Sequence, residues 1–194
     1  SARAASNPMK RKLDLLTGKS VWLSYRAPKP ASSPLERSIK TDILVVGAGI
    51  SGAMIAEALT DHGLSVVMID RRGPMLGSTA ATTALVQNEL DTPLSLLSKQ
   101  IGKDNARSAW RRSRLAVAAL KARIQELGIK CDFAERPSLL LAGNVLDASG
   151  LAEEVELRRE AGVYADYLTR AVLKQRFGIG RAAAILNPDN IAID

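Results

Sequence analysis

Three glycines within six residues give this chain its clearest chemical signal. Residues 47–52 read GAGISG and fit the GxGxxG pattern of dinucleotide-binding loops. In such a loop Gly47 would permit a tight turn, Gly49 would let a pyrophosphate approach the backbone, and Gly52 would let the following helix pack closely. The unpaired N–H groups at the start of that helix, assisted by the helix dipole, would then face the phosphates.

An acidic residue at a suitable separation strengthens this interpretation. Asp70 stands 23 positions after Gly47, near the ~20 residues expected before a carboxylate that binds ribose hydroxyls. A carboxylate would repel a 2′-phosphate, so NADP is disfavoured despite Arg71 and Arg72 next to it. The loop and the acid by themselves do not separate NAD from FAD.

The pattern around the loop predicts the elements that position it. Residues 43–46 (ILVV) are a short apolar run followed at once by glycine, which is typical of a strand buried on both faces. Residues 51–62 favour a helix that Gly63 ends, and residues 64–69 (LSVVMI) favour a second strand that leads to Asp70. The order strand, glycine turn, helix, strand predicts a right-handed βαβ unit.

A run of small residues follows this unit. Residues 77–84 (GSTAATTA) leave room for a ligand, and their hydroxyls could bind phosphate or ribityl oxygens. A helix start capped by Ser78 or Thr79 would explain the same residues, and both interpretations can hold together. Because an NAD-binding domain normally continues with another strand and helix, the run favours FAD, while an NAD-linked dehydrogenase stays open.

The rest of the chain predicts a mixed region of helices and strands. Residues 103–127 predict one long helix with an apolar stripe. The stripe consists of Ala106, Trp110, Ser113, Val117, Leu120, Ile124 and Leu127. The other expected elements are strands at 131–133 and 138–141 joined by a turn at 136–137, helices at 151–161 and 168–177, and a strand from residue 183.

The net charge of +7 is concentrated in one segment. Residues 1–40 contain nine of the 27 Lys and Arg residues but only two of the 20 acidic residues, so the remainder is balanced. Four prolines interrupt this segment, which predicts an irregular, solvated arm that lies on the domain. On the long helix, basic residues without interleaved aromatic residues favour a solvated face over a nucleic-acid site: Arg107, Arg111, Arg114 and Lys121.

The composition gives little support to other chemistry. The single Cys131 excludes an internal disulfide, and with only His62 beside it a structural zinc site is not expected. No apolar run approaches the ~20 residues of a membrane helix. We expect a reducing, cytoplasmic setting, with His62 on the surface at a helix end and Cys131 buried in a strand.

The sequence resembles the FAD-dependent oxidoreductases of the D-amino acid oxidase family. The resemblance rests on residues 42–52 (DILVVGAGISG), 66–72 (VVMIDRR) and 77–94 (GSTAATTALVQNELDTPL), and it extends more loosely to residue 194. It implies FAD as cofactor, hydride transfer to the flavin, and a small-molecule substrate: an amino acid, an amine or a hydroxy compound. The cofactor-binding residues it implies are Gly47, Gly49, Ile50, Ser51, Gly52, Asp70, Arg71, Ser78, Thr79, Thr83, Ala84 and Leu85.

The resemblance also assigns a place to each contact. Glu is the more usual acid in the family at the position of Asp70. Because Asp has a shorter side chain, Asp70 would reach a ribose hydroxyl but bind it less fully than Glu. The implied contacts are the pyrophosphate for Ile50 and Ser51, the adenosine ribose and its surroundings for Asp70 and Arg71, the phosphates for Ser78 and Thr79, and the ribityl chain and flavin for Thr83, Ala84 and Leu85.

The predicted fold class is α/β. We expect a Rossmann-like βαβ unit of the glutathione-reductase-type FAD/NAD(P)-binding fold, followed by the start of an α+β substrate domain. The expected divisions are a basic arm (1–40), the first part of the FAD-binding domain (41–95) and the start of a truncated substrate or cap domain (96–194). Family members are longer, so we expect the catalytic residues beyond Asp194 and name none. A non-catalytic truncated fragment that retains the fingerprint is the other alternative.

Overall fold

The computed structural model describes residues 18–25 and 30–194. The chain divides into two compact units, the first reaching to Thr83 and the second running from Ala84 to Asp194. The parts of the predicted N-terminal arm at 1–17 and 26–29 lie outside the described residues.

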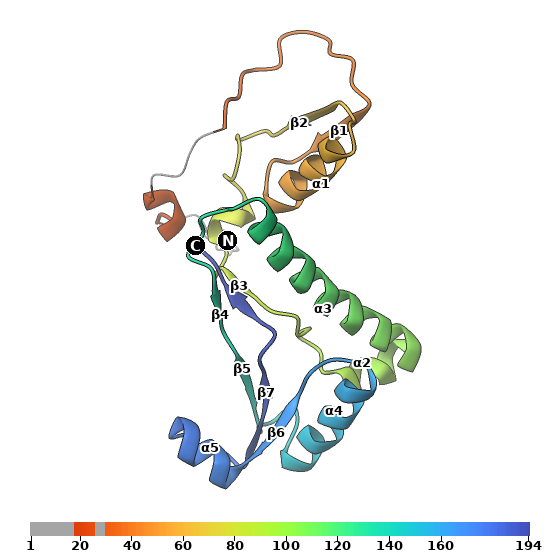
Figure 1. The fold of residues 1–194 in the computed structure, drawn as a ribbon, viewed down its shortest axis with the longest axis vertical. Helices are drawn as coiled ribbons and strands as arrows, with labels where there is room; N and C mark the ends of the chain where they lie inside the picture. The colour runs from red at the N-terminus through yellow and green to blue at the C-terminus, as the bar shows by residue number, and fades with distance from the viewer. Residues whose placement is uncertain (1–17, 26–29) are drawn as a thin grey trace, which may run out of the picture. The chain divides into compact units, whose positions relative to one another are not determined.

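The first unit is built on two parallel strands joined by a helix (Figure 1). Strand β1 (Ile43–Val46) pairs with β2 (Val66–Ile69), in a register that sets the first residue of one opposite the first of the other. Helix α1 (Ile50–Asp61) connects the strands and packs against both. The order of elements is the one that the sequence predicts, and it brings the carboxyl ends of both strands to one edge.

The second strand begins two residues later than predicted. Ser65 lies just before β2, where its N–H and hydroxyl donate to the Asp42 carboxylate at 2.9 and 2.7 Å. These bonds tie the start of β2 to the residue in front of β1. They also lower the pKa of Asp42 below its ordinary value, with the hydroxyl bond as the larger cause.

Two short 3-10 helices complete the described part of the first unit. Helix η1 (Val21–Ser24) lies in the N-terminal arm, and η2 (Ser78–Ala81) lies in the run of small residues. The two contact each other. This part of the arm therefore lies on the first unit, as the sequence predicts for a solvated arm.

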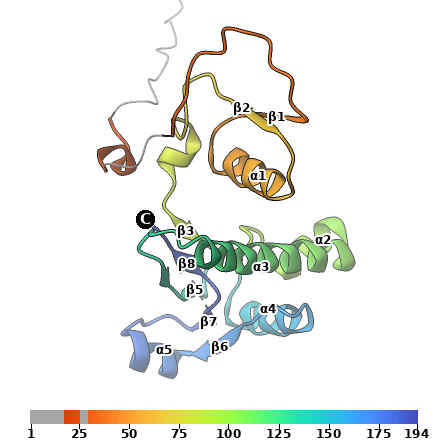
Figure 2. The same cartoon turned by 45° about the horizontal axis from the view of Figure 1, so that its top comes forward.

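The second unit contains two antiparallel three-stranded sheets. One has the order β5–β7–β6 (Ser138–Leu141, Ala183–Asn187, Asp166–Thr169), and the other has the order β3–β8–β4 (Leu85–Val86, Ile191–Ala192, Ala134–Glu135). The helices are α2 (Leu94–Ile101), α3 (Lys103–Glu126), α4 (Ala148–Glu160) and α5 (Arg170–Phe177). Helix α2 packs on both α3 and α4, and α4 packs on β7 (Figure 2).

The predicted hairpin at residues 131–141 is wrong. Its first strand is β4, at 134–135, and this strand pairs with β8, whereas β5 pairs with β7. Between them, the N–H of Arg136 donates to the carbonyl oxygen of Asn190 at 3.0 Å, so the chain passes from one sheet to the next without turning back. The pairing partners lie far along the chain, where no local pattern can indicate them.

The start of one helix differs from expectation, and another helix lies outside every predicted range. Leu168 and Thr169 belong to β6, and α5 begins at Arg170, because the Thr169 hydroxyl accepts from the helix as its N-cap. Helix α2 was not predicted, although Pro93 before it and Gly102 after it, at φ +83°, mark typical helix boundaries. Helix α3, helix α4 and strand β7 lie within three residues of their predicted ranges.

Helix α3 buries most of its predicted apolar stripe, through Ala106, Trp110, Val117 and Ile124, whereas Leu127 at the end of the stripe is exposed. Four basic side chains of α3 bind acceptors of the same unit, and such surface contacts are individually weak. The pairs are Arg107 with Glu160, Arg111 with the Ala161 carbonyl, Arg114 with Asp189, and Lys121 with Glu135. Among the helices of the described part of the chain, none has the length and apolarity needed to cross a lipid bilayer.

A buried ion pair joins α2, α4 and the segment after β3. The Glu154 carboxylate accepts the first two N–H groups of α2 and the Arg158 Nε–H, all at 2.8 Å. Arg158 also binds Glu89 at 3.0 Å and lies 4.5 Å from the Trp110 ring centroid. Burial raises the pKa of Glu154, but the Ser95 N–H and the Arg158 guanidinium outweigh it, so the pKa lies below its ordinary value. The carboxylate therefore stays ionised while it caps α2.

His62 and Cys131 have structural places. His62 is exposed at the C-terminal end of α1, with Nδ1 2.8 Å from the carbonyl oxygen of Ala58, as predicted. Cys131 is only half-buried and lies in no strand, so that prediction is wrong; the backbone turns at Asp132, where φ is +40°. Within residues 18–25 and 30–194, no three His, Cys, Asp or Glu residues form a group that could hold a metal ion.

Candidate cofactor site

The glycine loop forms the turn between β1 and α1. Gly47 has φ +110°, a conformation that favours glycine, and its N–H donates to the Ile69 carbonyl at 2.7 Å. A Cβ at position 52 would lie 1.9 Å from the Gly47 carbonyl oxygen, so Gly52 lets α1 start close to the loop. The tight turn and the close packing therefore each have a steric cause.

The start of α1 carries backbone donors. The Ile50 N–H donates to Thr79 Oγ1 at 2.9 Å, while within the described residues the N–H groups of Ser51 and Gly52 have no acceptor. A Cβ at position 49 would lie 2.9 Å from the same Thr79 oxygen, so Gly49 leaves the room that this hydroxyl needs. A helix N-terminus favours an oxygen that carries negative charge. Because the Thr79 hydroxyl lies at the N-terminus of α1, a phosphate oxygen could also bind there.

The Asp70 carboxylate ties the glycine loop to the end of β2. Its Oδ2 accepts the Ala48 N–H at 2.9 Å, and its Oδ1 accepts the N–H groups of Arg72 and Gly73 at 2.7 and 3.1 Å. The Ala48 bond, followed by the Arg72 bond, lowers the pKa of Asp70 below its ordinary value. A carboxylate has roughly four acceptor positions, so three internal bonds leave about one for a ribose hydroxyl.

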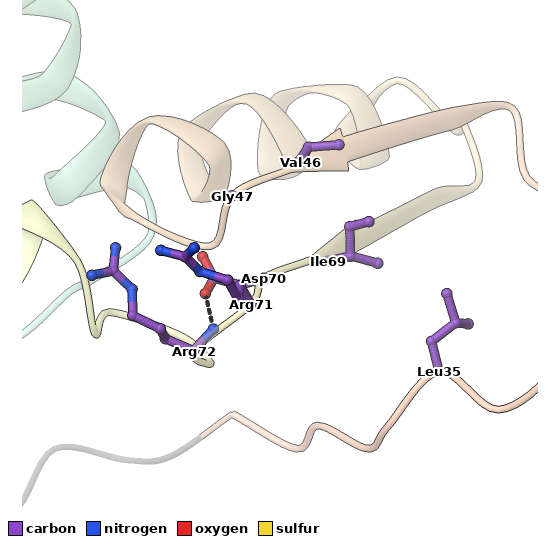
Figure 3. Close-up of a pocket in the computed structure, with 7 residues that line it drawn as sticks. All are labelled: Leu35, Val46, Gly47, Ile69, Asp70, Arg71 and Arg72. Carbon is purple, nitrogen blue, oxygen red and sulfur yellow. Dashed lines mark hydrogen bonds between the residues drawn. The ribbon is translucent and has the colours of Figure 1, made fainter.

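An open pocket of about 460 Å³ lies beside this carboxylate (Figure 3). Val46 and Ile69, at the ends of the two strands, form an apolar wall, and Leu35 from the segment before β1 points toward Ile69. An apolar wall next to a carboxylate and two guanidinium groups can bind a ring, a sugar hydroxyl and a phosphate in one place. The lining residues are Leu35, Val46, Gly47, Ile69, Asp70, Arg71 and Arg72.

The remaining predicted contact residues divide between the two units. Ser78 and Thr79 lie in η2, but neither side chain caps that helix, so the capping prediction is wrong; Thr79 bonds across to α1 instead. Thr83 ends the first unit, whereas Ala84, at φ +57°, and Leu85 begin the second. Their contacts with the ribityl chain and flavin stay predictions.

Sequence reasoning missed three residues that shape this site. Ala48 is clamped on both sides, since its N–H binds Asp70 and its carbonyl accepts the Met75 N–H at 2.9 Å. Leu35 lines the pocket, and Trp22 Nε1 donates to the Thr82 carbonyl at 2.7 Å. Hydrogen bonds of the backbone, such as those of Ala48, do not depend on the residue type, so the sequence cannot indicate them. Trp22 did have a signal, because it stands in an apolar VWL run within a polar arm.

The family of the chain follows from comparison with known proteins. The profile of the FAD-dependent oxidoreductase family (DAO) matches residues 42–194. The chain belongs to the FAD-dependent oxidoreductase family. The resemblance predicted from the sequence is thus confirmed, as is FAD as the cofactor of the family. Its mixed α/β architecture is that of FAD-dependent oxidoreductases.

Individual relatives of this FAD-dependent oxidoreductase chain are distant and longer. It is 25% identical over 175 residues to gamma-glutamylputrescine oxidoreductase of Escherichia coli (strain K12). The aligned region covers 78% of this chain and 41% of the relative. It is 27% identical over 139 residues to a Bacillus subtilis (strain 168) protein provisionally named as a Rieske 2Fe-2S iron–sulfur protein. The aligned region covers 72% of this chain and 27% of that protein.

A solved structure shows the same fold. L-proline dehydrogenase from P. horikoshii superposes with a TM-score of 0.61 at 23% identity, covering 80% of this chain and 38% of that one. The chain thus spans between 27% and 41% of the length of these relatives.

Proposed function

We propose that this chain is the nucleotide-holding portion of an FAD-dependent oxidoreductase that oxidises an amino acid, an amine or a hydroxy compound. One arrangement carries the proposal: the glycine turn, the start of α1 and Asp70 meet at the carboxyl edge of β1 and β2. Ligands of open α/β sheets bind at that edge. The proposed fold is Rossmann-like, with the FAD-binding part in residues 41–95 and a substrate or cap part in 96–194.

The residues at the start of α1 fit a diphosphate. The N–H groups of Ser51 and Gly52 would donate to its oxygens, and the helix dipole would favour its charge. Thr79 would keep the Ile50 N–H as its donor and turn its own hydroxyl proton toward a phosphate oxygen, since a hydroxyl can accept and donate together. Gly49 would keep the space between them free of a side chain.

The pocket beside Asp70 fits the adenosine half. The ionised carboxylate would accept one ribose hydroxyl in its remaining position, and Val46 and Ile69 would contact the ring. Arg71 would lie near the ribose and balance the negative charge of the diphosphate. A 2′-phosphate would meet the Asp70 carboxylate, so NADP fits this pocket poorly.

When bound, FAD would supply the hydride acceptor. The work of this chain is to hold and orient the dinucleotide. The names of two relatives, gamma-glutamylputrescine oxidoreductase and L-proline dehydrogenase, favour a nitrogen-containing substrate. We place the substrate contacts in the part of the relatives that this chain does not span, and the setting in the cytoplasm.

Ligand titration tests the proposal. The purified chain is titrated separately with FAD, NAD and NADP, and the bound fraction is followed by flavin fluorescence and by the thermal midpoint. We expect FAD to raise the midpoint in proportion to the logarithm of its concentration, and the two nicotinamide nucleotides to have little effect. Stabilisation by NAD alone would indicate an NAD-linked enzyme, and no stabilisation by any of the three would indicate a fragment that holds no cofactor.

A further inference from the structure

Two side chains of the N-terminal arm bind the backbone of the small-residue run. Ser20 Oγ donates to the Ala80 carbonyl, and Trp22 Nε1 donates to the Thr82 carbonyl at 2.7 Å. The donors belong to η1 and the residue before it, and the acceptors belong to η2 and the residue after it. The Tyr25 ring stacks on Trp22, with centroids 6.1 Å apart, and so limits how far the indole can swing.

The Trp22 bond decides which way one peptide group faces. In a planar trans peptide, the N–H of a residue points opposite to the carbonyl before it. Because the Thr82 carbonyl points at the indole, the Thr83 N–H points away from the arm. In the described part of the chain this N–H has no acceptor, and Thr83 is exposed. The arm therefore presents a free backbone donor on the side opposite to itself.

The Ser20 bond acts two residues earlier, at Ala80, which follows Thr79. Ala80 is buried, with 7% of its surface exposed, and its carbonyl is held by the Ser20 hydroxyl. Fixing this peptide group fixes the turn of η2 from which Thr79 reaches the Ile50 N–H. The two arm contacts thus hold the peptide groups after Ala80 and after Thr82, both within residues 79–83, the segment that the proposed site uses.

We infer that Ser20 and Trp22 are positioning residues of the cofactor site, and that they orient residues 79–83 so that the Thr83 N–H donates to an oxygen of FAD. This inference rests on the proposed function, which assigns FAD to this chain. It gives the basic arm a role that its composition does not indicate: the arm is part of the site's framework.

The test uses four variants of the full chain. Trp22→Phe keeps the ring but removes the N–H, Ser20→Ala removes the hydroxyl, and Ser20→Thr keeps it. Val21→Ala is the matched control, because Val21 lies in the same helix η1 and is 58% exposed. Loss of one hydrogen bond that positions a donor should weaken FAD binding about fivefold. We expect that loss in Trp22→Phe and Ser20→Ala, near-normal affinity in Ser20→Thr, and no change in Val21→Ala.

A second readout separates this inference from the proposed function. Amide hydrogen exchange of the peptide covering residues 78–84 is measured without cofactor in each variant. Faster exchange in Trp22→Phe than in Val21→Ala, together with the affinity loss, supports the inference. Equal affinity and equal exchange in these two variants overturn it. A wild-type chain that binds no FAD contradicts the proposed function, and the exchange result then still decides whether the arm orders this segment.

Discussion

The Thr79 hydroxyl oxygen lies 2.9 Å from the Ile50 backbone nitrogen and caps α1 from a separate segment of the chain. The residue before α1 is Gly49, which has no side chain to cap the helix itself. Because the loop before α1 must stay open for a ligand, the capping hydroxyl of α1 comes from η2. This relationship links the stability of α1 to the order of the small-residue run.

Replacing Thr79 with valine should weaken both the helix and the site. The isosteric change removes the acceptor of the Ile50 N–H, and loss of an N-cap costs about 1 kcal/mol of unfolding free energy. Urea unfolding of the cofactor-free protein measures that loss, and FAD titration measures the effect on binding. Thr79→Ser retains the hydroxyl and should restore both. If Thr79→Val matched the wild type in both assays, the capping role would be refuted.

Replacing Gly52 with alanine should be severe. The new Cβ would fall 1.9 Å from the Gly47 carbonyl oxygen, so the loop or α1 must move. We expect destabilisation of about 1–3 kcal/mol or more, in the range of overpacked interiors, and loss of measurable FAD binding. Gly180→Ala is the control, because a Cβ there meets nothing within 4 Å and its φ is not positive. Similar thermal midpoints for the two variants would contradict the close approach.

The Asp70 carboxylate should make the first unit sensitive to acid. Its pKa is lowered by the Ala48 and Arg72 bonds, so the folded state binds a proton less readily than the unfolded chain does. The stabilisation is therefore complete above the unfolded pKa of about 3.9 and is lost as the pH falls through the lower folded pKa. Unfolding of the wild type and of Asp70→Asn should differ by a constant amount from pH 7 to pH 5, and the difference should shrink below pH 4. A difference that did not vary with pH would argue against an ionised Asp70.

The buried ion pair gives a prediction for the second unit. Replacing Arg158 with methionine leaves Glu154 buried without its cation, which should cost about 3–5 kcal/mol of unfolding free energy. Glu156→Gln is a control on the same helix, since it breaks an exposed pair with Arg159 and should change stability by less than about 0.5 kcal/mol. Chemical denaturation measures both. Equal effects would show that Glu154 does not depend on Arg158.

The first unit could be predicted from the sequence because its information is local. Strand, loop, helix and strand follow one another directly, and residue types such as Gly47, Gly52 and Asp70 report backbone requirements that hold wherever the motif occurs. The second unit depends on pairing between distant segments. Nothing near residue 134 indicates that β4 must pair with β8 rather than with β5.

The contacts around the site show the same limit. The sequence suggests that Thr79 caps its own helix, whereas the structure sends its hydroxyl to α1. The sequence also suggests that the carboxylate of Asp70 faces a ribose. In the structure this carboxylate accepts three backbone N–H groups of the protein itself. Residue types indicate which side chains can form hydrogen bonds, but the partner of each bond is determined only by the folded chain.

The placement of β7 and β8 has a consequence for synthesis on the ribosome. These two strands are the middle strands of both sheets in the second unit, yet they leave the ribosome after all four of their partners. The nascent chain therefore carries β3, β4, β5 and β6 with open edges until residues 183–192 emerge, and such edges invite aggregation. Translation speed and chaperone supply near this point should govern how much of the protein is recovered in native form.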